Sequence, residues 1–307
     1  MSAKTNGKFG IKKIVALIFV IALVFTALLG LFIRNANSAG SATQYPLNIK
    51  DASGYTLNIS RAPSRIISMN PATTEMIFAA GYGDKLVGVT TYCDYPEAAM
   101  KIAKIGDINV NVEAIVALRP DIIIGMQDLQ PEILLRLRNL GLQVLIIDAS
   151  STNNILKEMD TIGIVCGNND QVSKVITDIR NRLEVVRRRT AGLAKPKVFI
   201  EIWNDPIMTA GRNTFIDEIV TLAGGNNIAS SIDGWPVVSN EFVIFSNPDI
   251  ILLTCYNKQE VMARRTWQLV TAVAKNQVYE VDANIASRNG PRFIDAVEQY
   301  ADIFHPR

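Results

Sequence analysis

The sequence predicts an α/β fold built from two Rossmann-like lobes, each with a central, mainly parallel sheet, joined by one long bridging helix. From Arg65 onward, short β-branched runs alternate with helical stretches, which is typical of parallel strands covered by helices. The same alternation restarts at Lys197. Between the two series, apolar residues recur at helical spacing without a break. One helix is therefore expected to connect two similar α/β halves.

Residues 1–34 form a basic n-region followed by an apolar segment. Four lysines precede the 20 uncharged residues from Ile14 to Ile33, which is the positive-inside arrangement of exported or anchored proteins. The length of this stretch matches the hydrocarbon core of a bilayer and favours an uncleaved transmembrane anchor. Small residues from Asn37 to Ala42 also fit a cleavage site, so a cleaved signal stays open. In either case the body is expected outside the cytoplasm, at the cell surface or in the periplasm.

Residues 35–60 are expected to form a tether and an N-terminal β-hairpin. Apolar and polar residues alternate from Tyr45 to Ser60, on both sides of the turn-forming run Asp51-Ala-Ser-Gly54. The tether would join the apolar segment to the folded body, and the hairpin would be a flap on the first lobe.

The remaining chain divides into an N-terminal lobe (61–167), the bridging helix (168–195) and a C-terminal lobe (196–307). The bridging helix is expected to stop at Ala191-Gly192 and Pro196. Its apolar residues are Val172, Val175, Ile176, Ile179, Leu183 and Val186. The predicted strands are Ile66–Ile67, Val87–Val89, Ile122–Ile124, Val144–Ile147, Lys197–Ile202, Ile250–Leu253 and Val278–Val281.

The two halves are related in sequence. The run Glu113-Ala-Ile-Val-Ala-Leu-Arg-Pro120 is echoed by Glu241-Phe-Val-Ile-Phe-Ser-Asn-Pro248, and both runs continue into Asp and a buried strand. Each lobe is therefore expected to contain a short helix that leads into a strand. The glutamates could simply favour helix N-termini. Alternatively, they are two anionic knobs, one per lobe, for a two-fold symmetric basic partner.

A second echo links Glu75-Met-Ile-Phe-Ala-Ala-Gly81 to Glu218-Ile-Val-Thr-Leu-Ala-Gly224, with the same spacing from Glu to Gly. The two echoes together predict pseudo-symmetric lobes.

Charge and cysteine content exclude several classes of protein. Five of the 31 basic residues lie in the first 34 residues, where there is no acid, which leaves 26 basic against 29 acidic residues in the body. Such a body has no electrostatic footprint for nucleic acid. Cys93, Cys166 and Cys255 show no metal-binding spacing, and none lies near the apolar segment where a lipid would be attached.

The sequence resembles the class III substrate-binding proteins of ABC importers, and within them most resembles the cobalamin-binding proteins. The similarity covers about Arg61 to Pro306. It is carried by the runs Arg65-Ile-Ile-Ser-Met-Asn-Pro-Ala-Thr-Thr-Glu75, Gly88-Val-Thr-Thr-Tyr-Cys-Asp94-Tyr95-Pro96, Asn111-Val-Glu113 with Pro120-Asp121, Trp235-Pro236 with Glu241, and Gly290-Pro291-Arg292.

The resemblance implies a ligand cleft between the lobes and delivery of the ligand to a dimeric ABC permease with its ATPase subunits. It implies a monomer without a resident cofactor, whose cargo is a corrinoid of the vitamin B12 type. By motif position, Glu113 and Glu241 would dock onto arginines of the two permease subunits.

The ligand contacts implied by the resemblance are Tyr95, Trp235 and Arg288. Three positions depart from the family pattern. This chain has Asp107 where the characterised cobalamin binder has a tryptophan, Met208 where it has a phenylalanine, and Asn284 where it has an aspartate. These departures leave the ligand open.

The chemistry of the cleft residues permits more than one cargo. A corrinoid is large, flat and rich in neutral amides, and it calls for aromatic faces with little net charge. Tyr92, Tyr95, Trp203 and Trp235 lie at strand ends or in loops, where cleft residues belong, although each could be half-buried packing. The alternative is an iron-chelate importer, since Arg212, Arg288 and Arg292 could bind an anionic ferric siderophore.

Haem is the other form of this alternative, with Tyr92 or Tyr95 as its axial ligand. His305, the only histidine, lies beyond the last predicted helix. No nucleophile elbow, Walker loop or internal histidine is present, so no enzyme activity is expected.

Overall fold

The computed structural model describes residues 43–167, 170–254 and 257–306. The predicted signal or anchor segment lies outside these residues. None of the helices within the described ranges has the length and apolarity that a bilayer crossing requires.

The predicted hairpin is confirmed. β1 (Leu47–Lys50) pairs antiparallel with β2 (Thr56–Ile59), from Leu47 opposite Ile59 to Lys50 opposite Thr56. Asp51 fixes the turn, because its buried carboxylate accepts hydrogen bonds from the backbone N–H groups of Ser53 and Tyr55 and from the Arg138 side chain. The hairpin is thereby tied to the first lobe.

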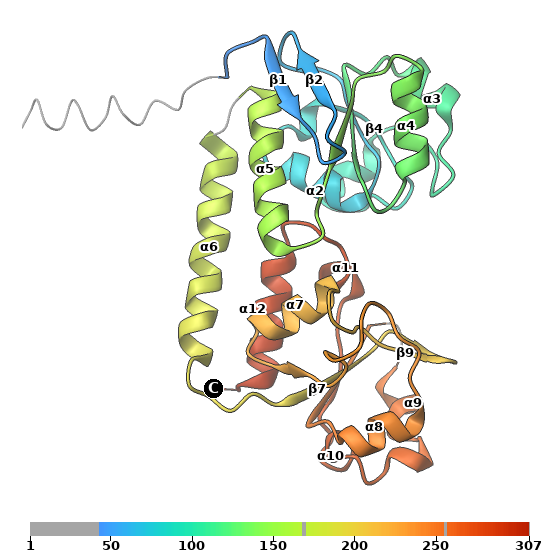
Figure 1. Cartoon of the computed structure of the whole chain (residues 1–307), viewed down its shortest axis with the longest axis vertical. Coiled ribbons are helices and arrows are strands. Elements are labelled where there is room, and N and C mark those ends of the chain that lie inside the picture. The colour runs from blue at the N-terminus through green and yellow to red at the C-terminus, as the bar shows by residue number, and fades with distance from the viewer. Residues whose placement is uncertain (1–42, 168–169, 255–256, 307) are drawn as a thin grey trace, which may run out of the picture. The chain divides into compact units, whose positions relative to one another are not determined.

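The N-terminal lobe has a parallel sheet in the order β4-β3-β5-β6, with helices in its crossovers (Figure 1). Its strands are almost wholly buried, as expected when both faces of a parallel sheet are covered. In chain order the elements are β3 (Ile66–Ser68), α2 (Pro71–Ala79), β4 (Leu86–Val89), α3 (Val112–Ala117), β5 (Ile122–Met126), α4 (Pro131–Asn139), β6 (Val144–Ile147) and α5 (Thr152–Cys166), with 3₁₀ turns at Gly83–Lys85 and Glu97–Lys101.

The C-terminal lobe repeats this design. Its parallel sheet has the order β10-β7-β11-β12, and the first, second, third and fourth strands occupy the same relative places as in the first lobe. An added antiparallel hairpin, β8-β9, follows β7. The elements are β7 (Lys197–Glu201), β8 (Trp203–Asn204), β9 (Ile207–Met208), α7 (Phe215–Leu222), β10 (Asn226–Asn227), α8 (Asn240–Ser246), β11 (Ile250–Leu253), α9 (Lys258–Met262), a 3₁₀ turn (Arg265–Trp267), α10 (Thr271–Ala274), β12 (Val278–Glu280), α11 (Ala283–Ala286) and α12 (Phe293–Phe304).

The repeated Pro-Asp pairs serve the same purpose in both lobes. The Asp121 carboxylate accepts from the backbone N–H of Arg65 at 3.0 Å, and Asp249 accepts from that of Lys197 at 2.8 Å. Each aspartate thus ties the start of its lobe's third strand to the start of the first. The sequence echo therefore reflects a structural repeat.

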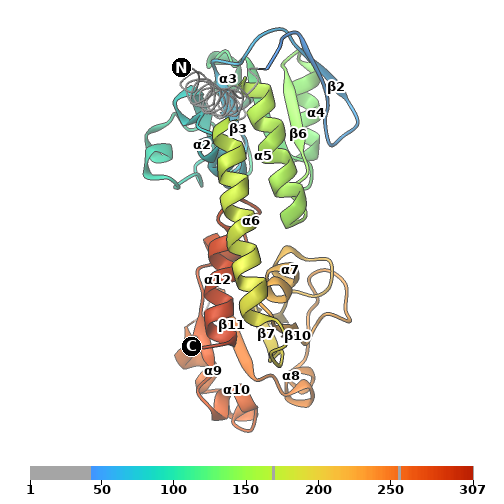
Figure 2. The same ribbon diagram turned by 90° about the vertical axis from the view of Figure 1, so that its left-hand side faces the viewer.

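Helix α6 (Asp170–Thr190) lies within the predicted bridging segment and runs from one lobe to the other (Figure 2). It packs on α5 of the first lobe and on α12 and α7 of the second. Val172, Ile176, Ile179 and Val186 face these neighbours and are buried, while the rest of the helix is mostly polar. One amphipathic helix is thus shared by both lobes.

Candidate ligand-binding site and docking surface

A pocket of about 420 Å³ lies at the carboxyl ends of the first lobe's strands. Residues that follow β3, β4 and β5 form its wall, which is where open parallel sheets place their ligands. Arg288, from the second lobe, closes one side. The full lining is Met69, Asn70, Pro71, Thr90, Tyr92, Asp107, Ile108, Leu129, Gln130 and Arg288.

The rim of this pocket offers apolar side chains to a ligand. Tyr92 is 55% exposed, and Ile108 and Leu129 are also more than half exposed. A group of exposed apolar side chains around one pocket is typical of a binding surface. A flat apolar ligand would cover them.

Two amide side chains in the pocket keep unpaired polar atoms. The Asn70 Oδ1 caps α2 by accepting from the Thr73 backbone N–H at 2.8 Å, while its Nδ2 is buried with no partner. The Gln130 Nε2 donates to the Ile108 carbonyl at 3.2 Å, while its Oε1 is buried with no partner. Both atoms are thus unpaired within the protein and buried.

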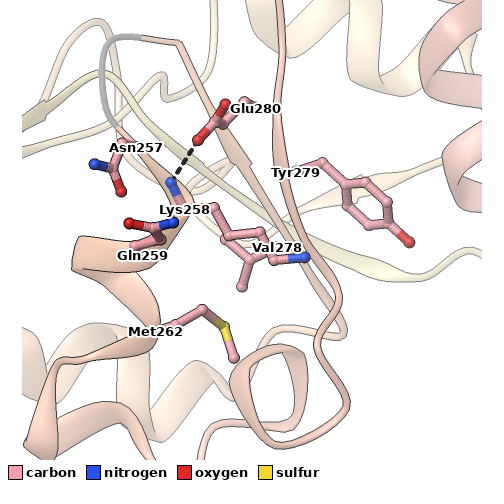
Figure 3. Close-up of a pocket in the computed structure, with 7 residues that line it drawn as sticks. All are labelled: Asn257, Lys258, Gln259, Met262, Val278, Tyr279 and Glu280. Carbon is pink, nitrogen blue, oxygen red and sulfur yellow. Dashed lines mark hydrogen bonds between the residues drawn. The ribbon is translucent and has the colours of Figure 1, made fainter.

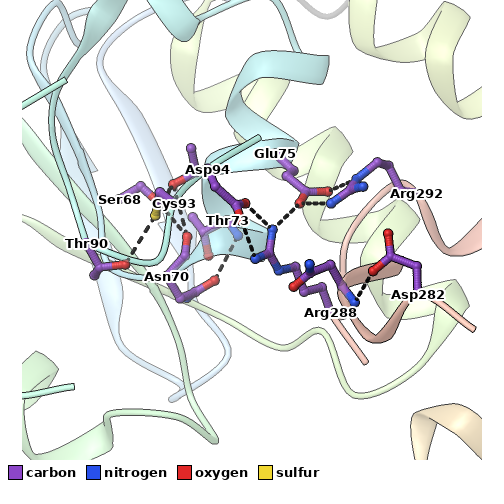
Figure 4. A network of polar contacts seen from close by, with 12 residues as sticks. Ser68, Asn70, Thr73, Glu75, Thr90, Cys93, Asp94, Asp282, Arg288 and Arg292 are labelled. Carbon is purple, nitrogen blue, oxygen red and sulfur yellow. Dashed lines mark hydrogen bonds and ion pairs between the residues drawn. The ribbon is translucent and has the colours of Figure 1, made fainter. Parts of the chain in front are cut away.

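Arg288 is held by acids of the first lobe (Figure 4). Its guanidinium donates to the Asp94 carboxylate at 2.6 and 3.1 Å and to Glu75 at 3.3 Å. The Arg288 hydrogen bond is the main reason that the pKa of Asp94 lies below its usual range. Burial favours a lower pKa for Arg288, but the hydrogen bonds and charges of Asp94 and Glu75 together outweigh it, and the pKa is raised. Arg288 is therefore a neutralised cation in the pocket wall.

Tyr95 lies in a different pocket from Tyr92. The Arg292 guanidinium lies over the Tyr95 ring, 4.0 Å from the ring centroid. Arg292 also donates hydrogen bonds to the Glu75 carboxylate (Figure 4). With Pro96 and residues of α6 and α12, Tyr95 lines a pocket of about 350 Å³. The structure thus separates the two predicted tyrosines.

The predicted residues of the second lobe gather around β8-β9. Met208 pairs with Trp203 across the hairpin and forms a bridge with Val237, two residues beyond Trp235. Trp203, Trp235 and Val237 are each about half exposed. They form an apolar surface after β7, outside the lining of the 420 Å³ pocket. Asn284 lies apart from them and is exposed in α11, where its backbone N–H donates a hydrogen bond to the Asp282 carboxylate.

The predicted docking glutamates occupy equivalent places in the two lobes. Glu113 is exposed in the first turn of α3, behind the Asn111 cap, and Glu241 is exposed in the first turn of α8, behind the Ser239 cap. Hydrogen bonds from its own backbone N–H and from Ser239 lower the pKa of Glu241. Neither glutamate has an ion-pair partner among the described residues.

A further pocket of about 660 Å³ lies in the second lobe between α9 and β12 (Figure 3). The Lys258 backbone N–H donates to the Glu280 carboxylate at 2.7 Å, so part of its polar wall is already satisfied. None of the predicted site residues lines it. Within the described ranges, no group of three His, Cys, Asp or Glu residues could hold a metal ion.

Sequence reasoning missed several residues of the first pocket. Of its lining, Asn70, Ile108, Leu129 and Gln130 were not considered as ligand contacts. Glu75 and Asp94, which hold Arg288 but do not line the pocket, were quoted only as parts of motifs. The available signal for the four lining residues was their place, since each of them follows a strand or precedes a helix at the carboxyl edge of the sheet.

Comparison with known proteins assigns the family. Residues 66–285 match the family described as periplasmic binding protein. An uncharacterized ABC transporter substrate-binding lipoprotein of Bacillus subtilis, YvrC, is 33% identical over 85% of this chain and 86% of its own. A vitamin B12-binding protein of Yersinia pestis is 32% identical over 78% of this chain and 86% of its own.

Among solved structures, the periplasmic vitamin B12-binding protein BtuF of Vibrio cholerae superposes with a TM-score of 0.72. It is 32% identical, and the match covers 79% of this chain and 96% of BtuF. Two lobes with parallel sheets, as predicted, are thus confirmed. The chain belongs to the periplasmic binding protein family.

Proposed function

We propose that this protein is the extracytoplasmic substrate-binding protein of an ABC importer, and that it captures a corrinoid of the vitamin B12 type. The relatives named for ABC transport and vitamin B12 binding support this proposal. The observation that carries it is the pocket after β3, β4 and β5, which combines exposed apolar side chains with unpaired amide atoms. A large ligand with neutral amides fits this chemistry.

Three arginines bear on the competing cargo, an anionic ferric siderophore or haem. Arg288 and Arg292 are paired with Glu75, and Arg288 also with Asp94, while Arg212 lies 3.8 Å from Asp233. An anionic chelate would have to compete with these carboxylates. The paired state of the arginines therefore favours a neutral ligand.

In the proposed complex the ligand lies between aromatic surfaces of the two lobes. Tyr92 would contact it from the first lobe, and Trp235 and Met208 from the second. Tyr95, which lines a separate pocket beside Arg292, would contact only a part of the ligand that extends beyond the pocket of Tyr92. Arg288 and Asn284 would supply polar contacts at the lobe boundary. No chemical step is assigned to the protein, because the cargo is carried and not converted.

Delivery would use the charged knobs of the two lobes. A monomer would present Glu113 and Glu241 to basic residues of the two permease subunits, and ATP would be hydrolysed by separate subunits. Residues 1–34 would either anchor the protein at the outer face of the membrane or direct its export and then be cleaved off.

Titration of the full-length chain in detergent tests the cargo. Tryptophan and tyrosine fluorescence would be followed on addition of cyanocobalamin, cobinamide, haem and a ferric siderophore. Saturable quenching by the corrinoids alone is expected. Saturable binding of haem or the siderophore alone would overturn the proposed ligand.

A further inference from the structure

We infer that Asn70 and Gln130 together recognise a primary carboxamide of the ligand and select it against a carboxylate. The inference rests on the proposed function, because it concerns the part of a bound corrinoid that would enter the 420 Å³ pocket. It begins with the two unpaired atoms in that pocket, Asn70 Nδ2 and Gln130 Oε1. Asn70 is only 5% exposed, so its unpaired donor is withdrawn from water.

The hydrogen bonds of both side chains fix which atom remains free. The Asn70 Oδ1 is occupied by the Thr73 backbone N–H, which leaves the N–H₂ group as a donor. The Gln130 Nε2 is occupied by the Ile108 carbonyl, which leaves the Oε1 as an acceptor. These two side chains thus offer one free donor and one free acceptor.

A primary carboxamide matches this pair, because its carbonyl oxygen accepts and its N–H₂ group donates. A carboxylate of the same shape only accepts. It could bind Asn70 but would set a negative oxygen against the Gln130 Oε1. Leaving a buried polar atom unpaired is costly, so a ligand that pairs both atoms is favoured.

The charges around the pocket act in the same direction. Asp107 lines it and would repel a carboxylate. Arg288, the only cation among the lining residues of this pocket, is already paired with Asp94 and Glu75. Nothing in the lining therefore compensates an anionic ligand group.

The pocket wall must yield slightly for the contact to form, since both free atoms are shielded from water. Gln130 is the side chain able to move, because one hydrogen bond of 3.2 Å to the exposed Ile108 loop holds it. A shift of the Gln130 side chain together with the Ile108 loop would expose the Oε1 while the Nε2 keeps its hydrogen bond.

The test compares amide and acid forms of one ligand. The probes are cyanocobalamin and derivatives in which one peripheral carboxamide at a time is hydrolysed to a carboxylate. Dissociation constants would be measured by fluorescence quenching for the full-length chain and for Asn70→Ser and Gln130→Met. Serine also caps helices, so Asn70→Ser removes the donor but keeps the α2 cap. Gln130 makes no side-chain cap bond, so Gln130→Met should fold.

Asn111→Ser is the matched control. Asn111 caps α3 of the same lobe, because its Oδ1 accepts a hydrogen bond from the Ala114 N–H at 2.9 Å. It does not line the pocket. Wild type should bind cyanocobalamin about tenfold more tightly than at least one acid derivative. This ratio should fall toward one in Asn70→Ser and Gln130→Met and stay unchanged in Asn111→Ser.

The outcomes separate this inference from the proposed function. If the variants weaken amide and acid forms equally, or if wild type does not discriminate between the forms, the carboxamide role is overturned and corrinoid binding stands. If wild type binds no corrinoid at all, both are overturned. Circular dichroism and thermal unfolding of each variant would establish that it is folded.

Discussion

The carboxylate of Glu75, on α2 of the first lobe, accepts two hydrogen bonds from Arg292, which directly precedes α12 of the second lobe, at 2.9 and 2.7 Å. The Glu75 side chain is 1% exposed. Its sequence counterpart, Glu218 on α7, accepts from the backbone N–H and hydroxyl of Thr152 at the start of α5, at 3.0 and 2.6 Å. Both glutamates of the second sequence echo thus contact the opposite lobe.

We expect Glu75→Ala to destabilise the protein strongly. The change leaves Arg292 unpaired in a largely buried place and removes one partner of Arg288. Breaking a buried ion pair by removing one partner costs about 3–5 kcal/mol. Denaturant unfolding followed by circular dichroism would measure the loss in free energy of unfolding.

Asp295→Asn is the control for this change. Asp295 pairs with Arg182 at 2.6 Å, but both side chains are substantially exposed. Exposed pairs contribute about 0–1 kcal/mol, so the effect should be small. An equally small effect of Glu75→Ala would contradict a stabilising tie between the lobes.

We expect Tyr92→Ala and Trp235→Ala each to weaken ligand binding about tenfold, since each removes an aromatic contact face. Fluorescence or absorbance titration with cyanocobalamin would measure the dissociation constants. Phe245→Ala is the control, because Phe245 is 87% exposed on α8 and lines none of the pockets described above. A similar loss in all three variants would argue against a specific aromatic site.

The contact between Asp94 and Arg288 should be sensitive to acid. The pKa of Asp94 is lowered in the folded protein, chiefly by the Arg288 hydrogen bond. The contact therefore stabilises the fold above the unfolded pKa, near 4, and is lost as the pH falls through the folded value. The stability difference between wild type and Asp94→Asn should be constant at neutral pH and shrink below about pH 4.

Asp84→Asn provides the comparison for this pH series, since Asp84 is exposed and pairs only with its neighbour Lys85. It should show a much smaller difference from wild type at every pH. The same acid-dependent difference in both variants would remove the special role of Asp94.

We expect replacement of both Glu113 and Glu241 by alanine to abolish uptake without changing the ligand dissociation constant. Both carboxylates are exposed, and neither forms an ion pair with another described residue. They therefore remain available to a basic partner. Uptake of labelled ligand by cells and binding by the purified protein would be measured in parallel. Glu132 and Glu260, exposed in the first turns of α4 and α9, are the matched pair to replace as a control. Normal uptake by the Glu113 and Glu241 double variant would refute the docking role.

The fold could be predicted because local pattern and burial agree. The runs Ile122–Ile124 and Ile250–Leu253 are β-branched or apolar throughout, and both became central strands buried on both faces. The spacing from Val172 to Val186 likewise required one continuous apolar stripe, which α6 provides.

The contacts between the lobes could not be predicted in the same way. Glu75 and Arg292 are 217 residues apart in the sequence. The residues around each of them give no indication that the two side chains are in contact. The sequence suggests Arg292 as a contact for an anionic siderophore, whereas in the structure it binds the buried Glu75. The orientations of Asn70 and Gln130 also follow from tertiary hydrogen bonds, which the sequence does not reveal.

The way the chain enters the first lobe determines how a mechanical pull from its N-terminal side is resisted. The Tyr45 hydroxyl donates to the Val165 carbonyl at 2.7 Å, so tension meets this anchor before it reaches the hairpin. Beyond it, force would peel β1 from β2 one residue pair at a time, starting at Leu47 and Ile59. Peeling would stop at Asp51, whose several hydrogen bonds must break together. A tethered molecule could therefore yield at its first strand under load while both sheets stay intact.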